Sequence, residues 1–115
     1  MAREFFRIVA GNVPTLKDFW TMRQQGRPLR NPALRREWAE GISVYDDLDA
    51  ACEVARKYGF RPGAYVVKVM VPDDGSVAFR QTFDEEHHYT IYDEPERVFA
   101  FIEGDVIPIP GATGE

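Results

Sequence analysis

The stretch that most constrains the fold is Ala64–Val71, which reads Ala-Tyr-Val-Val-Lys-Val-Met-Val. Successive residues of a strand point to opposite faces, and here both faces are apolar apart from Lys68. A strand with two apolar faces is covered from both sides. The segment therefore predicts a central strand of a sheet.

Further strands are predicted over Glu4–Ala10, Ile42–Tyr45, Ser76–Phe83, His87–Tyr92 and Val106–Ile109. Pro72-Asp73-Asp74-Gly75 has strong turn chemistry, so Ser76–Phe83 is expected to return as a hairpin beside Ala64–Val71. Pro108 cannot donate to a ladder, which predicts that the last strand lies at an edge.

Helix signals lie between these strands. Capping residues predict helices that begin after Thr15, after Asn31, after Asp46 or Asp47, and at Asp93-Glu94-Pro95. Glycines end the first three, at Gly26, Gly41 and Gly59. The third is the clearest, with its apolar residues spaced at three and four: Leu48, Ala51, Cys52, Ala55 and Tyr58.

The expected order is β-α-α-β-α-β-β-β-α-β, which favours an α+β fold. We expect a single compact domain over residues 1–109, with a mixed or antiparallel sheet and three to four short helices. Residues 110–115 have nothing to bury and are expected to form a flexible C-terminal tail.

The net charge of −5 over 115 residues is unevenly distributed. Residues 1–41 hold eight Lys and Arg against four Asp and Glu, whereas residues 42–115 hold six against fifteen. The basic residues gather in the 23–36 segment, which suits either a phosphate-bearing partner or charge balance within the molecule. The overall acidity argues against broad affinity for nucleic acid.

Cysteine usage and hydropathy bear on the compartment. Cys52 is the only cysteine, so an intrachain disulfide is excluded and a cytoplasmic location is expected. No segment is long and apolar enough to span a bilayer, and the charges among the first residues argue against a signal peptide.

Three groups of residues could carry chemistry. Arg7, in the middle of a predicted strand, suits a bidentate grip on phosphate or carboxylate, or a structural ion pair. Ser43 and Tyr45 share a strand face, where they could hydrogen-bond a ribose and stack on a base, or pack in the core. His87 and His88 are adjacent on a strand and point apart, so no metal site is expected, although one could carry protons.

Taken in order, Phe6-Arg7-Ile8, Ile42-Ser43-Val44-Tyr45 and His88-Tyr89-Thr90 resemble the ADP-ribosyltransferase-like fold, including its short bacterial members. The resemblance implies NAD as the cofactor. Arg7 would hold it, Ser43 would support it, and Tyr45 would line the pocket for its nicotinamide ring. His88 or Thr90 takes the place of the family's usual glutamate. The implied catalytic residues are thus Arg7, Ser43 and His88, and the implied cofactor contacts are Arg7, Ser43, Tyr45 and Thr90.

The missing glutamate leaves the function open. A carboxylate stabilises the oxocarbenium-like state of nicotinamide cleavage, and only Glu86 and Asp93 flank the relevant strand. One hypothesis is ADP-ribose transfer to a protein or RNA acceptor. The others are a non-catalytic module that binds a phosphate or nucleotide, and a protein-interaction module. A glutamate in the cleft favours the first, arginines without an acid the second, and a filled sheet face the third.

Overall fold

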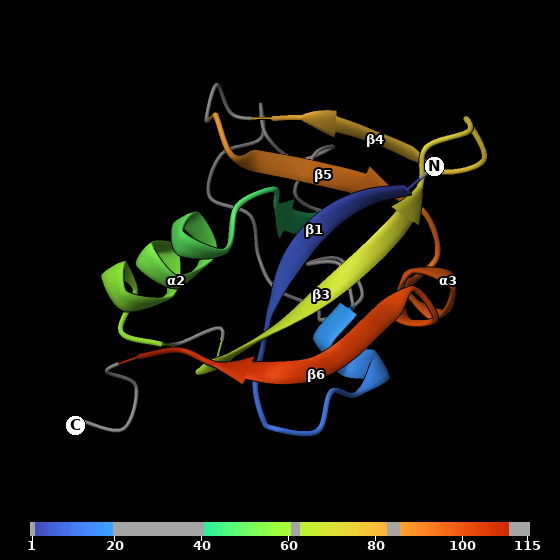
Figure 1. The fold of residues 1–115 in the computed structure, drawn as a ribbon. Helices are drawn as coiled ribbons and strands as arrows, with labels where there is room; N and C mark the ends of the chain where they lie inside the picture. Colours follow the sequence, from blue (N-terminus) through green and yellow to red (C-terminus); the bar gives the residue numbers. More distant parts are fainter. Residues whose placement is uncertain (1, 20–40, 61–62, 83–85, 111–115) are drawn as a thin grey trace.

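An antiparallel sheet organises the computed structural model, which describes residues 2–19, 41–60, 63–82 and 86–110 (Figure 1). Over these residues the strands are β1 (Ala2–Val9), β2 (Ile42–Tyr45), β3 (Tyr65–Pro72), β4 (Ala78–Gln81), β5 (His88–Tyr92) and β6 (Ile102–Pro108). Their order in the sheet is β4-β5-β2-β1-β3-β6, and all neighbours pair antiparallel. β3 lies in the interior of the sheet, as its two apolar faces predict, and β6 forms an edge, as Pro108 predicts.

The predicted fold class is wrong in its helix content. The sequence predicts three to four short helices, whereas the described residues hold two, α2 (Leu48–Lys57) and α3 (Pro95–Phe99), beside a mostly antiparallel sheet. After Thr15 the described chain forms only a 3-10 turn, η1 (Leu16–Phe19). The Asp18 carboxylate accepts from the Thr15 and Ala10 amides, so this motif ties a turn to the end of β1. A capping motif marks where a helix can begin but does not determine its length. The rest of that predicted helix and the next one, at 32–41, lie almost wholly outside the described residues.

The predicted hairpin between β3 and β4 is also wrong. β3 pairs with β1 and β6, and β4 pairs with β5. The turn itself forms, since the Asp74 carboxylate accepts from the Ser76 amide at 2.9 Å. Local turn chemistry therefore directs the chain away from β3 but does not select the partner strand, which is chosen by side-chain packing.

Two apolar cores lie on the two faces of the sheet. The α3-side core is built around η1 and α3 and contains Phe5, Val9, Phe19, Ile42, Val44, Val67, Val69, Val71, Val77, Ile91 and Val98. The α2-side core lies under α2 and contains Phe6, Ile8, Ala51, Cys52, Ala55, Val66 and Ile109. Neighbouring residues of β1 and β3 enter opposite cores, as strand alternation requires. An apolar core thus lies on each face of the sheet. Cys52 lies on the inner face of α2, where burial raises the pKa of its thiol.

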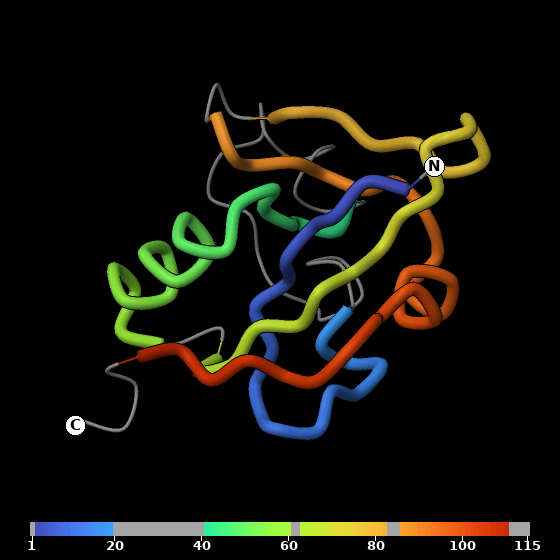
Figure 2. The backbone as a smooth tube through the Cα atoms, in the orientation of Figure 1, coloured from blue at the N-terminus to red at the C-terminus, as the bar shows by residue number. Residues whose placement is uncertain are grey.

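The sheet curls strongly around the α3-side core. β2 and β5 separate β1 from β4 in the strand order, yet the Phe5 ring lies 5.2 Å from the Phe79 ring and 5.1 Å from the Tyr89 ring, measured between centroids. Figure 2 shows β1 and β3 running side by side, with β4 and β5 at an angle to them. The Arg3 guanidinium lies 5.3 Å from both the Phe5 and Tyr89 centroids, at the β1 end of this cluster.

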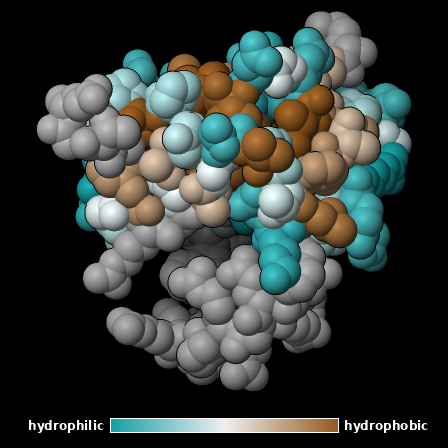
Figure 3. Space-filling view, turned by 90° about the horizontal axis from the view of Figure 1, so that it is seen from below, coloured by the Kyte–Doolittle hydropathy of each residue, from teal (hydrophilic) through white to brown (hydrophobic). Residues whose placement is uncertain are grey.

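The described surface mixes apolar and polar side chains. Seen from below, hydrophobic side chains lie across the middle of the described surface and hydrophilic ones gather toward its edge (Figure 3). Among the described residues, the large hydrophobic side chains that are mostly exposed are Val13 and Tyr58. Single exposed hydrophobic residues of this kind are ordinary in soluble folds and indicate no site by themselves.

The ends of α2 follow the predicted signals. Asp47, one of the two predicted caps, accepts from the Ala50 amide at 2.9 Å. Gly59 adopts a left-handed φ of 66°, and the following amide, that of Phe60, donates to the Ala55 carbonyl at 2.7 Å. This arrangement is a Schellman-type end, for which glycine is the favoured residue. The Asp47 cap and this C-terminal end together fix the length and position of α2.

Candidate functional site

Arg7 is held by the backbone of its own protein. Its Nε and Nη2 donate to the Asp18 carbonyl at 2.9 and 2.8 Å, and its Nη1 donates to the Ser43 carbonyl at 2.6 Å. The guanidinium also lies 5.8 Å from the Phe19 ring centroid. Burial lowers the pKa of Arg7 to about 10, which leaves it charged at neutral pH. These contacts give Arg7 a structural role, tying β1 to η1 and β2.

The other sequence-predicted residues lie on the opposite face of the sheet. Ser43 pairs with Thr90, and Tyr45 pairs with His88, between β2 and β5. Ile42, Val44 and Ile91 occupy the α3-side core, so these four residues face the side of α2. Arg7 shares its face with Phe5 and Val9. The structure therefore brings the side chains of Ser43, Tyr45, His88 and Thr90 to one face of the sheet and places that of Arg7 on the other, where it contacts Ser43 through the backbone carbonyl.

A shallow, open pocket of about 340 Å³ lies on the α2 side, at the end of β2 and the start of β5. It is lined by Tyr45, Ala50, Glu53, Val54, Lys57, Glu86, His87 and His88. Of the sequence-predicted site residues, Tyr45 and His88 belong to this lining. Their rings meet edge to face, with centroids 5.3 Å apart.

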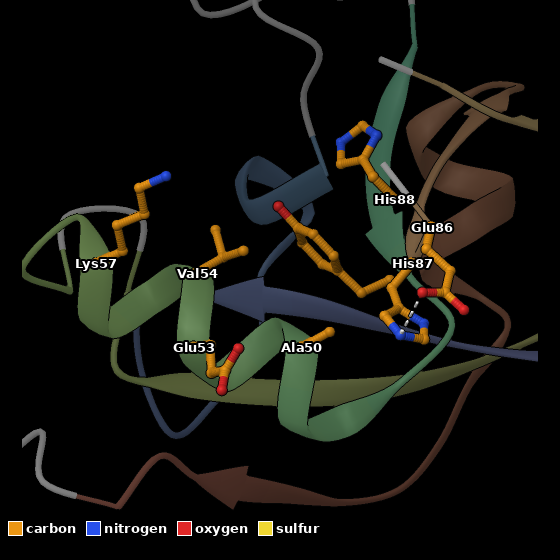
Figure 4. A pocket seen from close by; sticks show the side chains of 8 residues that line it. Ala50, Glu53, Val54, Lys57, Glu86, His87 and His88 are labelled. Carbon is orange, nitrogen blue, oxygen red and sulfur yellow. Dashed lines mark ion pairs between the residues drawn. The ribbon is translucent and has the colours of Figure 1, made fainter. Parts of the chain in front are cut away.

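The charges of the pocket are separated along its length. Figure 4 shows Lys57 at one side and Glu86 with His87 at the other, with Glu53 projecting from α2 between them. The Lys57 ammonium lies 5.7 Å from the neighbouring Tyr58 ring. The pocket is thus basic at the C-terminal end of α2 and acidic at the side where β5 begins. Such an arrangement suits a ligand that carries opposite charges at its two ends.

His87 is the most strongly bound side chain of the acidic side. Its Nδ1 lies 2.8 Å from the Asp46 Oδ1, and its backbone carbonyl accepts from the Asp46 amide at 3.0 Å. Its Nε2 lies 3.9 Å from the Glu86 Oε2. The hydrogen bond to Asp46 raises the pKa of His87 above its ordinary value. Asp46, which the sequence offers as an alternative helix cap, instead links the start of α2 to β5.

His88 belongs to a buried polar chain behind the pocket. Its Nδ1 lies 2.6 Å from the Thr82 hydroxyl, which lies 2.8 Å from the Thr90 hydroxyl. All three residues are at least nine-tenths buried. Because the Thr82 hydroxyl has one proton, it can donate to at most one of these two neighbours. Figure 4 shows the His88 ring directed away from His87, so the two imidazoles do not share a ligand position.

Within the part of the chain that the structure describes, no cluster of three or more His, Cys, Asp or Glu side chains is placed to hold a metal ion. The helices described here include none with the length and apolar character needed to cross a membrane. The basic 23–36 segment lies outside the described residues.

Comparisons with protein-family models, with curated proteins and with solved structures give no match for this chain. The site must therefore be interpreted from its own geometry. Sequence reasoning did not place Glu53, Lys57 or Glu86 in a pocket. A signal was nevertheless present for two of them, since Glu53 and Lys57 are four residues apart and both lie off the apolar stripe of α2.

Proposed function

We propose that this domain binds NAD⁺ or a related nucleotide in the pocket beside α2. The supporting observation is the separation of charge along the pocket, with Lys57 at one side, Glu86 at the other and the Tyr45 ring in the lining. NAD⁺ carries a flat cationic nicotinamide ring at one end and anionic phosphates further along. The ring matches Tyr45 and Glu86, because an aromatic face and a carboxylate both attract a flat cation. The phosphates match Lys57.

This mode of binding differs from the one that the family resemblance implies. Arg7 is committed to the Asp18 and Ser43 carbonyls, so it is not available to grip phosphate. Lys57 takes that role as a point charge on a flexible stem. Tyr45 keeps the nicotinamide-lining role implied by the resemblance, and Ser43 and Thr90 support the strands that present it.

Thermal-shift titration with NAD⁺ and with ADP-ribose tests the proposal. A ligand that binds only the folded state adds about 2.7 kcal/mol of stability at a hundred times its Kd. We expect Lys57→Ala to weaken binding of both ligands about tenfold, the effect of removing one charge-assisted contact. Arg56→Ala is the matched control, since Arg56 is the neighbouring cation on α2 but lies outside the pocket lining. A folded wild type that is not stabilised by either ligand at millimolar concentration would overturn the proposal.

A second candidate function, transfer of ADP-ribose from NAD⁺, is favoured by the position of Glu86 in the pocket lining. In that reaction the bond between the nicotinamide nitrogen and the ribose C1′ breaks, and nicotinamide leaves with the bonding electron pair. An acceptor nucleophile then bonds to C1′ and releases its proton to solvent. Glu86 would stabilise the oxocarbenium-like state between these steps.

Nicotinamide release from NAD⁺ distinguishes the two candidates. If the domain transfers ADP-ribose, Glu86→Gln is expected to slow release about a hundredfold or more, in the range found for loss of one stabilising group. Glu53→Gln is the control, because it removes a second pocket carboxylate from a different element, α2. Binding of NAD⁺ without release above the uncatalysed rate would leave a non-catalytic nucleotide-binding module as the function.

A further inference from the structure

His87 occupies the acidic side of the pocket and is surrounded by charged groups from three segments. Asp46 contacts its Nδ1 at 2.8 Å, and Glu86 approaches its Nε2 at 3.9 Å. Asp47, the helix cap beside Asp46, adds a third negative charge nearby. From α2, Glu53 lines the same pocket.

The charge of His87 sets how negative this side of the pocket is. With a neutral imidazole, the negative charges of Glu86 in the lining and of Asp46 behind His87 are not compensated, and a flat cation is attracted there. With an imidazolium, one positive charge lies between the two carboxylates and cancels much of their field. Lys57, the other pocket cation, lies at the opposite side.

We propose that His87 determines the specificity of the pocket for a cationic ring, so that the neutral imidazole admits the nicotinamide of NAD⁺ and the protonated imidazole disfavours it. This inference rests on the nucleotide-binding function proposed above. Binding of the ADP-ribose part of the ligand, whose phosphates lie toward Lys57, depends much less on the charge of His87. The quantity that His87 controls is therefore the ratio of the affinities for NAD⁺ and for ADP-ribose, rather than the affinity for either ligand alone.

The hydrogen bond that the His87 ring donates to Asp46 shifts the pH at which His87 loses its proton. Because Asp46 raises the pKa of His87, the imidazolium persists to a higher pH than that of an isolated histidine. The ratio of affinities is expected to change as the pH rises through and above the ordinary range of histidine titration. We expect a change of about three- to tenfold, the size produced by one charge a few ångström away at a solvent-exposed site.

Isothermal titration calorimetry of the full chain with NAD⁺ and with ADP-ribose, at about pH 5.5, 7 and 8.5, tests the inference. The preference for NAD⁺ over ADP-ribose should rise with pH in the wild type and stay constant in His87→Gln. The glutamine side chain retains an amide donor for Asp46 without the titrating charge. A pH-dependent preference that persists in His87→Gln would assign the effect to another group and overturn the inference.

A second measurement keeps the test independent of the variant. Binding linkage is reciprocal, so saturation with NAD⁺ should lower the pKa of His87 relative to its value in the ADP-ribose complex. Two-dimensional NMR of the imidazole protons reports this shift directly. Binding of both ligands with a preference that does not vary with pH would overturn the inference and leave the nucleotide-binding function intact. Absence of binding at every pH would overturn both.

Discussion

At the scale of single residues, Arg7 stabilises the fold, although its position in the sequence suggests that it binds a ligand. Arg7 interrupts an apolar strand, a position that suits either a ligand grip or a structural pair. In the structure its donors reach the carbonyls of Asp18 and Ser43, which belong to two other segments of the chain. Backbone carbonyls inside a protein require a donor, and a buried guanidinium requires acceptors, so each satisfies the other.

Replacement of Arg7 should therefore affect stability and spare the pocket. Arg7→Met leaves the Asp18 and Ser43 carbonyls without these donors, and we expect a loss of about 3 kcal/mol in the free energy of unfolding. Arg56→Met, which removes one exposed hydrogen bond to the Pro110 carbonyl, should cost less than about 1 kcal/mol. Urea denaturation measures both. A folded Arg7→Lys that has lost NAD⁺ affinity while Lys57→Ala keeps it would contradict this assignment of roles.

His87 gives a pH dependence of stability whose sign follows from its contacts. Its pKa in the folded protein is raised above 6.5, chiefly by the hydrogen bond to Asp46. The folded state thus binds the proton more tightly than the unfolded state does. This contribution is fully present below the unfolded pKa and is lost as the pH rises through the folded pKa.

We expect His87→Gln to lower the free energy of unfolding more at about pH 5.5 than at about pH 8.5. Denaturant unfolding at the two pH values, without ligand, measures the difference between wild type and variant. The same experiment on Asp46→Asn should show the same trend, because the two side chains form one pair. An equal difference at both pH values would mean that the pair does not persist in solution.

At the scale of elements, α2 carries half of the pocket lining. Ala50, Glu53, Val54 and Lys57 come from this one helix, so its start and its rotation set the site. Local signals determine both, since Asp47 caps the helix and its apolar stripe faces the α2-side core. The pocket wall is therefore the part of the site that follows most directly from local sequence.

Asp47→Ala should cost about 1 kcal/mol in the free energy of unfolding, the usual value of a lost helix cap. Asp49→Ala is the matched control, because Asp49 is an acidic residue in the first turn that makes no capping bond to Ala50. It should cost clearly less, about 0.3 kcal/mol, through the helix dipole. Equal losses in urea denaturation would show that charge near the helix start, rather than the cap, stabilises α2.

At the scale of the whole molecule, the curl of the sheet joins strands that are distant in the strand order. Phe5 of β1 contacts Phe79 of β4 and Tyr89 of β5, and it is fully buried. These contacts close the α3-side core across the sheet. Close packing between distant segments also occurs at Gly63, where a Cβ would lie 1.9 Å from the Val9 carbonyl oxygen.

Phe5→Ala should destabilise the whole molecule by about 4 kcal/mol, as expected for a large aromatic side chain removed from a closed core. Val13→Ala is the surface control, with a side chain 71% exposed, and should change stability by less than about 0.5 kcal/mol. Because Phe5 joins three strands, unfolding of β4 and β5 should remain coupled to that of β1 in wild type. Separate transitions in amide hydrogen exchange of wild type would contradict that coupling.

Local pattern accounts for the individual elements of this protein. Alternation located five strands of the described residues to within two residues at each end, but began the last strand, β6, four residues late, at Val106; the capping residues located the starts of α2 and α3. Alternation also placed Ser43 and Tyr45 on one face of β2 and Ile42 and Val44 on the other. These features depend on neighbours in the sequence, so they follow from local pattern alone.

How the elements meet follows from contacts between distant segments of the chain. The partner of β4, the contact of Arg7 with the Ser43 carbonyl on the face opposite the Ser43 side chain, and the closeness of Asp46 to His87 all depend on which strands pair and on how the sheet curls. Turn residues fix where a chain reverses, and periodicity fixes which side chains share a face. Neither specifies which distant surface a face will meet, because that choice rests on the packing of side chains from the whole chain.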